Sequence, residues 1–266
     1  MERDARRKWL VIGGMGLNST GQRQSPLSPY AVVHRNASSW RWGHAWNSCR
    51  SLLSATAGGQ EPVRFRPATW RSRLEPHGAA HVLGIGVSSS GGADGDRLVS
   101  RGDLVHLREC VGDDPDGLRD LFVAVMIWGS GTANGRGPRY TQAALADPRV
   151  LTVLGVTRDA VREGDLGGAY RKFVLRGVGR SFFTKWFAVV DDRAGASDRA
   201  LILDARVFRS LNALGWVSWE AAGTREWSVR YAVYVKSMHG CASSMGVTAD
   251  WLEWLLFHLN GRVGET

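Results

Sequence analysis

The chain has 266 residues, of which 44% are hydrophobic, and this is enough apolar side chain for one large or two modest globular domains. It contains no run of about 18 apolar residues, which argues against a transmembrane helix. The formal net charge of +9 favours a polyanionic partner, although an arginine-rich chain from a GC-rich genome would show the same excess.

The positive charge is concentrated in the N-terminal part of the chain. Residues 1–100 contain 13 Lys and Arg against 6 Asp and Glu, a balance of +7, whereas residues 101–266 contain 21 against 19, a balance of +2. Over residues 1–97 we predict an irregular basic region rich in Arg, Trp, Ser and Gly, with some β structure. A Ser/Gly cluster over residues 88–95 is typical of a linker, so we place a helical domain at residues 98–266.

Two segments of the N-terminal region have a recognisable pattern. Residues 81–87 form a single strand-like run. Between residues 34 and 50, tryptophans alternate with basic side chains, an arrangement that can stack on bases and neutralise phosphates. We favour the alternative, a small packed subdomain or a weakly ordered extension. The residues of this segment are Arg35, Trp40, Arg41, Trp42, His44, Trp46 and Arg50.

After residue 102, apolar residues recur at helical spacing almost to the end of the chain. Asp103, Asp114 and Asp165 are candidate N-caps, and Asp204 is another. We therefore predict a mainly α fold with short connecting loops. The predicted helices span residues 104–110, 117–128, 140–146, 151–161, 165–175, 180–190, 205–214, 227–245 and 248–259.

The turn Gly177-Val178-Gly179 separates two of these helices. In the first we expect Tyr170, Phe173 and Val174 to face inward. Glycine permits a tight turn and a close approach of the backbone, so free N–H groups at the start of the second helix can face a phosphate. Such a turn holds one strand of DNA without reading its sequence. In this helix-hairpin-helix, Arg180 and Ser181 are further candidate phosphate donors.

These residues also carry a family resemblance. The segment Leu175–Gly179, followed by a lysine-bearing helix and an apolar run that ends in Asp204, resembles the core of the helix-hairpin-helix DNA glycosylases. Ser181–Lys185 and Leu201–Asp204 are most similar to bacterial proteins with an 8-oxoguanine DNA glycosylase fold. The resemblance covers about residues 102–261 and does not extend to the first hundred.

The resemblance implies an activity, a partner and a catalytic pair. A glycosylase binds double-stranded DNA, flips a damaged or modified base into a pocket and cuts its glycosidic bond. A carboxylate, here Asp204, stabilises positive charge on the sugar. Members that also cut the backbone use a lysine amine, here Lys185, to form a Schiff base. No cofactor is implied beyond a structural monovalent cation at the turn, and iron–sulfur cysteines are absent.

One departure from the family concerns the lysine. In the better-known lysine-bearing members it lies two residues after the last glycine of the turn, where this chain has Ser181. Lys185 lies one helical turn further along the same face. An extended lysine spans about 6 Å against a rise of about 5.4 Å per turn, so its amine can reach the expected point. Otherwise Lys185 is a structural or surface lysine, and Asp204 is an N-cap alone.

The base pocket and the remaining DNA contacts are less well defined by the sequence. Trp128, His239, Trp254 and His258 are candidates for the pocket, although aromatic residues at helical spacing more often belong to a core. Arg136, Arg139 and Tyr140 follow a glycine-rich loop that either faces DNA or is an ordinary surface connection.

Two alternatives to a glycosylase remain open. The chain could be a helix-hairpin-helix DNA-binding module without catalysis, as Ser181 at the usual lysine position suggests, or a helical protein-interaction scaffold. The three cysteines form no CxxC pair and the histidines do not pair with carboxylates at ligand spacing, so we expect no metal. We also expect a cytoplasmic bacterial monomer that does not contact membranes.

Overall fold

The computed structural model describes residues 60–89, 95–131 and 135–263 and is mainly helical, as predicted. The tryptophan- and arginine-containing segment between residues 34 and 50 lies outside the described residues. Within the described part, no helix has the length and apolarity needed to cross a bilayer. The helices are α2 Pro67–Leu74, α3 Arg101–Val111, α4 Pro115–Gly129, α5 Gly137–Leu145, α6 Val150–Arg162, α7 Leu166–Lys172, α8 Arg180–Val190, α9 Ala205–Ala213, α10 Ser218–Ala222, α11 Trp227–Met245 and α12 Ala249–Leu259.

A small antiparallel sheet precedes the main helical part. Its strands are β1 Val63–Phe65, β2 Val87–Ser88 and β3 Arg97–Val99, in the order β1-β3-β2. The prediction of a strand over residues 81–87 was wrong, because Ala80–Gly84 forms a 3-10 helix.

Hydrogen bonds from Arg97 help to explain why residues 81–87 do not form one extended strand. Its guanidinium donates to the carbonyl oxygens of Gly84, Ile85 and Gly86 at 2.6–2.9 Å, which folds these three residues around one side chain. Gly86 has φ +72° and lies so close to β3 that a Cβ there would meet the carbonyl of Leu98 at 2.0 Å. These bonds, together with the 3-10 helix before them, hold residues 84–86 in a curve, and the strand begins only at Val87.

The first residues of α3 and α4 are capped by side chains. Asp114 caps α4 by accepting from the N–H of Gly117, as predicted. For α3 the predicted cap was wrong by three residues: Ser100 is the N-cap, and Asp103 completes a capping box by accepting from the N–H of Ser100. The sequence allowed either residue, because both serine and aspartate are good caps.

The first hairpin helix is shorter than predicted. Asp165 caps α7 as expected, but the helix ends at Lys172, after which Phe173 is extended. Phe173 is buried and stacks on Phe183 at 5.1 Å. Val174 then points away from the core and is 52% exposed, contrary to the prediction, since side chains alternate along an extended chain.

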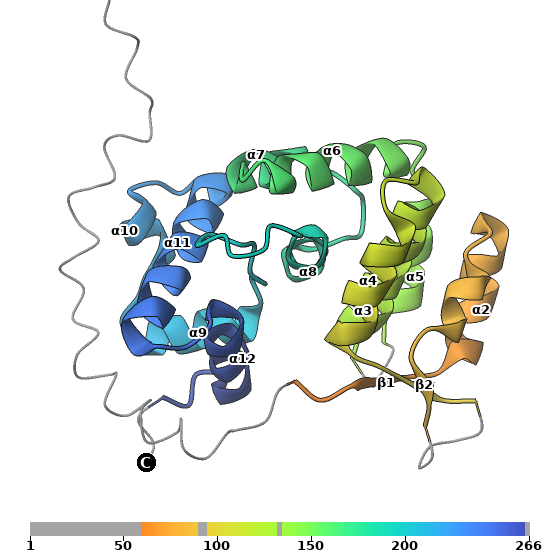
Figure 1. Ribbon diagram of the computed structural model, residues 1–266, viewed down its shortest axis with the longest axis horizontal. Coiled ribbons are helices and arrows are strands. Elements are labelled where there is room, and N and C mark those ends of the chain that lie inside the picture. The colour runs from red at the N-terminus through yellow and green to blue at the C-terminus, as the bar shows by residue number, and fades with distance from the viewer. Residues whose placement is uncertain (1–59, 90–94, 132–134, 264–266) are drawn as a thin grey trace, which may run out of the picture.

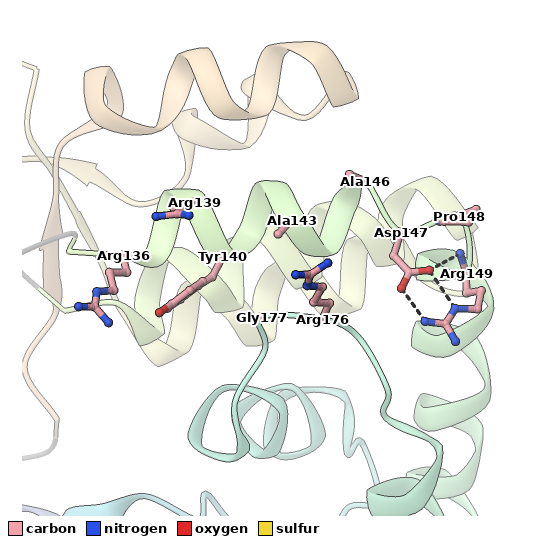
Figure 2. A pocket seen from close by; sticks show the side chains of 10 residues that line it. All are labelled: Arg136, Arg139, Tyr140, Ala143, Ala146, Asp147, Pro148, Arg149, Arg176 and Gly177. Carbon is pink, nitrogen blue, oxygen red and sulfur yellow. Dashed lines mark hydrogen bonds and ion pairs between the residues drawn. The ribbon is translucent and has the colours of Figure 1, made fainter.

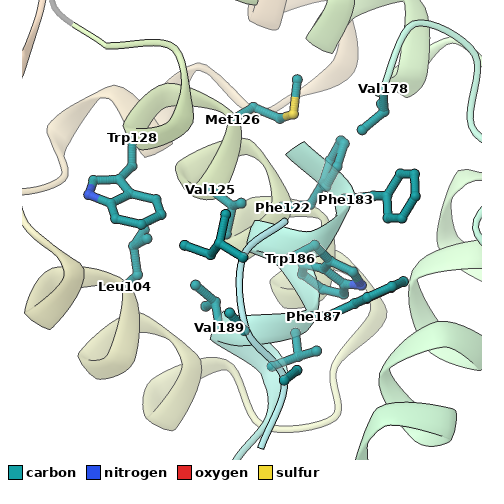
Figure 3. Close-up of a cluster of buried hydrophobic side chains, with 14 of the residues drawn as sticks. Leu104, Phe122, Val125, Met126, Trp128, Val178, Phe183, Trp186, Phe187 and Val189 are labelled. Carbon is teal, nitrogen blue, oxygen red and sulfur yellow. The ribbon is translucent and has the colours of Figure 1, made fainter. Parts of the chain in front are cut away.

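Helix α8 occupies the centre of the molecule. In Figure 1 it lies between a group formed by α2–α5 and a group formed by α9–α12, with α6 and α7 along one edge. Trp186 and Phe187 of α8 are fully buried, and Phe122 of α4 packs edge-on against Trp186 at 6.1 Å (Figure 3). Residues of distant segments therefore meet along α8: Phe122 contacts Trp186, and Tyr231 contacts Phe187.

Candidate active site

Lys185 and Asp204 meet beside the N-terminal half of α8. Lys185 Nζ lies 3.7 Å from Asp204 Oδ2, and the two side chains are 11% and 17% exposed. The amine also donates to the carbonyl of Ser181 at 3.1 Å, so the lysine leans toward the start of its helix. Gly129 at the end of α4 leaves space for the lysine stem, since a Cβ there would meet Lys185 Cδ at 2.9 Å.

The surroundings of this pair oppose a charged amine. Burial lowers the pKa of Lys185, and the carboxylates of Asp204 and Glu253 offset part of that effect. A lowered pKa increases the fraction of the neutral, nucleophilic amine near neutral pH.

Asp204 divides its two oxygens between two partners. Oδ1 accepts from the N–H of Arg206 at 2.9 Å and caps α9, and Oδ2 faces Lys185. One carboxylate can therefore cap the helix and remain available to an adjacent substrate.

The segment that leads to Asp204 is extended, buried and held by side chains. The N–H of Leu203 donates to Thr184 Oγ1 at 2.9 Å, and the N–H of Ile202 donates to Glu253. Since the segment has neither a helix nor a sheet to satisfy its backbone, these bonds replace a regular partner.

Two tyrosines of α11 hold the carbonyl side of the same segment. The hydroxyl of Tyr231 donates to Leu201 O at 2.8 Å, and that of Tyr234 donates to Ile202 O at 2.9 Å. Both tyrosines are fully buried. Side chains of three helices, α8, α11 and α12, thus hold the backbone segment that positions Asp204.

Glu253 is a residue that sequence reasoning missed. It is 5% exposed, and burial raises its pKa to about 7, against the opposing charge of Arg101. Its sequence signal was a lone carboxylate on the apolar face of the helix over residues 248–259. Such a residue is seldom buried without a specific partner, and here the partner is a backbone N–H.

The hairpin turn is exposed at its two glycines. Gly177 has φ +81°, a conformation that L side chains rarely adopt, and Val178 between the glycines is 8% exposed and anchors the turn. Gly179 is the N-cap residue of α8 and has open space around its Cα. The turn can therefore approach another backbone closely.

A basic hollow of about 830 Å³ opens beside this turn (Figure 2). Arg136, Arg139 and Tyr140 line it from α5 and the residue before it, and Arg176 lines it from the turn. Among the described residues, none of these three arginines forms an ion pair with a carboxylate. Arg149 also lines the hollow but binds Asp147 at 2.8 Å. The predicted loop contacts and the turn thus share one cationic surface; the loop tip, residues 132–134, lies outside the described part.

The other predicted phosphate donors have partners within the protein. Arg180 stacks its guanidinium on the ring of Trp227, 3.5 Å from the centroid. Ser181 is half-buried and uses its carbonyl to bind Lys185.

A contact joins two of the four candidates for the base pocket. Trp128 is 2% exposed and packs near Leu104 (Figure 3), and its Nε1 has no partner among the described residues. His239 donates from Nε2 to Arg199 O at 2.9 Å. Trp254 and His258 stack on each other on α12, with centroids 5.8 Å apart. Only Trp254 and His258 contact each other, so a shared pocket stays a prediction.

Comparison with known proteins places the chain in a family. A family model described as "Putative 8-oxoguanine DNA glycosylase OGG-like protein" matches residues 56–257. The prediction that the resemblance does not extend to the first hundred residues was wrong, because the match begins at residue 56. Neither a search of curated proteins nor one of solved structures returns a significant match. Within the described part, no group of three or more His, Cys, Asp or Glu is placed to hold a metal ion. Since the match covers more than half of its length, the chain belongs to the OGG-like protein family, whose name and helical fold indicate a DNA glycosylase-like function.

Proposed function

We propose that this protein excises a damaged or modified base from double-stranded DNA, with Lys185 and Asp204 as catalytic residues. The observation that carries the proposal is the distance of 3.7 Å between Lys185 Nζ and Asp204 Oδ2, in a site that follows directly on an exposed hairpin turn. An oxidised purine of the 8-oxoguanine type is the first substrate to test, since the family name refers to it.

The turn and the basic hollow would hold the DNA backbone. The amides at the start of α8 face one phosphate, and Arg136, Arg139 and Arg176 neutralise others without reading the bases. Because none of these arginines is ion-paired within the described residues, their charges are available to a polyanion.

The catalytic pair would act on a base flipped out of the duplex. The carboxylate of Asp204 stabilises the positive charge that develops on the sugar as the base leaves with the electrons of the glycosidic bond. The neutral amine of Lys185 then forms a bond to the sugar C1′ and loses a proton. The C1′–O4′ bond breaks, O4′ takes up a proton, and the amine and C1′ form a Schiff base; alternatively, water attacks in place of the amine. Neither route requires a cofactor.

Base excision tests the proposal directly. Duplexes that each carry one lesion are incubated with the protein, and borohydride is added to an abasic-site duplex to trap an imine. We expect excision from at least one duplex, loss of trapping in Lys185→Gln, and loss of excision in Asp204→Asn, which retains the helix cap. Lys236→Gln removes an exposed lysine of α11 and serves as the matched control, with no effect expected.

A DNA-binding module without catalysis is the competing outcome. The ion pair and the bond to Ser181 already occupy the amine of Lys185, which is what a structural lysine would also do. Duplex binding without excision of any lesion and without imine trapping would establish that alternative.

A further inference from the structure

Trp227, at the start of α11, lies between two arginines. The guanidinium carbon of Arg180 is 3.5 Å and that of Arg230 is 3.4 Å from the centroid of the indole ring. Two groups at this distance from one ring cannot share a face, so the charges lie on opposite faces, roughly 7 Å apart.

This cluster has no negative partner. Among the described residues, neither Arg180 nor Arg230 forms an ion pair with a carboxylate. Arg180 hydrogen-bonds with the side chain of Tyr170, and Arg230 donates to the hydroxyl of Ser218 at 2.6 and 3.0 Å. Burial lowers the pKa of Arg230, and the charge of Arg180 lowers it further. Arg180 and Arg230 are both half-buried, and no carboxylate offsets the repulsion between their charges. An anion that binds between or beside them is therefore stabilised by both charges.

The cluster is linked to the proposed catalytic pair through α8 and α9. Arg180 is the first residue of α8, directly after Gly179 of the hairpin turn. Its guanidinium also lies 5.9 Å from the ring of Phe208, which is one turn of α9 from Asp204 on the same face. The cluster therefore contacts both the helix that begins at the turn and the helix that Asp204 caps.

We propose that Arg180 and Arg230, held apart by Trp227, bind a backbone phosphate of the DNA strand that the hairpin turn holds. This rests on the proposed binding of DNA but does not require excision. Stacking on an indole orients a guanidinium without using its in-plane N–H donors. Arg230 gives Nε and one amino group to Ser218, so its other amino group is the donor for a phosphate. Because both faces of Trp227 are occupied, the site takes a charged group and not a stacked base.

The test measures duplex affinity as a function of salt concentration. Arg230→Gln should weaken binding severalfold at low salt and reduce the slope of log K against log salt by about 1, the effect of one lost phosphate contact. Arg225→Gln, a change of the same charge at an exposed residue two positions before Trp227, should leave both values unchanged.

Methylphosphonate substitution, which removes the charge of one phosphate at a time, then locates the contact. At the phosphate that Arg230 contacts, methylphosphonate should lower the affinity of the wild type for the duplex. The same substitution should cause no further loss of affinity in Arg230→Gln. If Arg230→Gln folds poorly by circular dichroism, Arg230→Lys keeps the charge without the planar stack and should show an intermediate loss at the same position.

The outcomes separate this site from the proposed function. Equal affinity and slope for wild type and Arg230→Gln, or equal losses for Arg230→Gln and Arg225→Gln, would overturn the phosphate site while excision still stands. Salt-dependent binding that Arg230→Gln reduces, without excision of any lesion, would support the site and refute the enzyme. Absence of duplex binding by the wild type would refute both.

Discussion

Replacing Glu253 with glutamine should stabilise the protein above neutral pH and change little in acid. Burial raises the pKa of Glu253 from an ordinary 4.5 to about 7. For an acid with a raised pKa in the folded state, stability is highest below the unfolded pKa and is lost as pH rises through the folded pKa. At about 1.4 kcal/mol per pKa unit, the ionised carboxylate costs about 3 kcal/mol at pH 8.

Glutamine removes this cost but keeps an oxygen that can accept from the N–H of Ile202. We therefore expect the stability of Glu253→Gln relative to wild type to rise by about 2–3 kcal/mol between pH 5 and pH 8. Urea unfolding at both pH values measures it, because the other ionisable groups cancel between the two proteins. Glu220→Gln, at an exposed position of α10, should show no such change. A stability difference that is equal at pH 5 and pH 8 would refute the reasoning.

Three further predictions concern the pair and the turn. Asp204→Ala should lower the free energy of unfolding, measured in urea, by about 1 kcal/mol because α9 loses its cap. Asp204→Asn should lower it by less than half of that, because asparagine keeps the cap. Equal losses in the two variants would mean that the cap bond contributes nothing to stability. The initial rate of borohydride trapping should rise with pH and level off below pH 10.5, because burial lowers the pKa of Lys185; a rate still rising above that pH would contradict a buried amine. Gly177→Ala should cost about 1–2 kcal/mol because of its positive φ. Gly179→Ala, at φ −74° with no atom near its Cβ, should cost less than Gly177→Ala, about 0.5–1 kcal/mol for a poorer N-cap, yet bind duplex DNA more weakly. Unchanged duplex affinity of Gly179→Ala in fluorescence anisotropy would exclude the turn as a phosphate site.

Much of the local structure was predictable because its causes are local. The caps at Asp114, Asp165 and Asp204 each bind an N–H two or three residues away, and all three were identified from the sequence. The errors arose where a distant residue decided the backbone. Arg97 folds residues 84–86 around its own side chain, and the stacking of Phe173 on Phe183 ends α7 early.

By itself, the sequence determined the helical class and the glycine turn, and it identified Lys185 and Asp204 as candidates for a catalytic pair. Apolar spacing, glycine and capping act within one or two turns of chain, so a pattern of neighbours contains them. Only the tertiary structure decided that Glu253 holds the backbone leading to Asp204, and that Trp227 separates Arg180 from Arg230. These contacts join helices far apart in sequence, and which faces meet depends on how all the helices pack around α8.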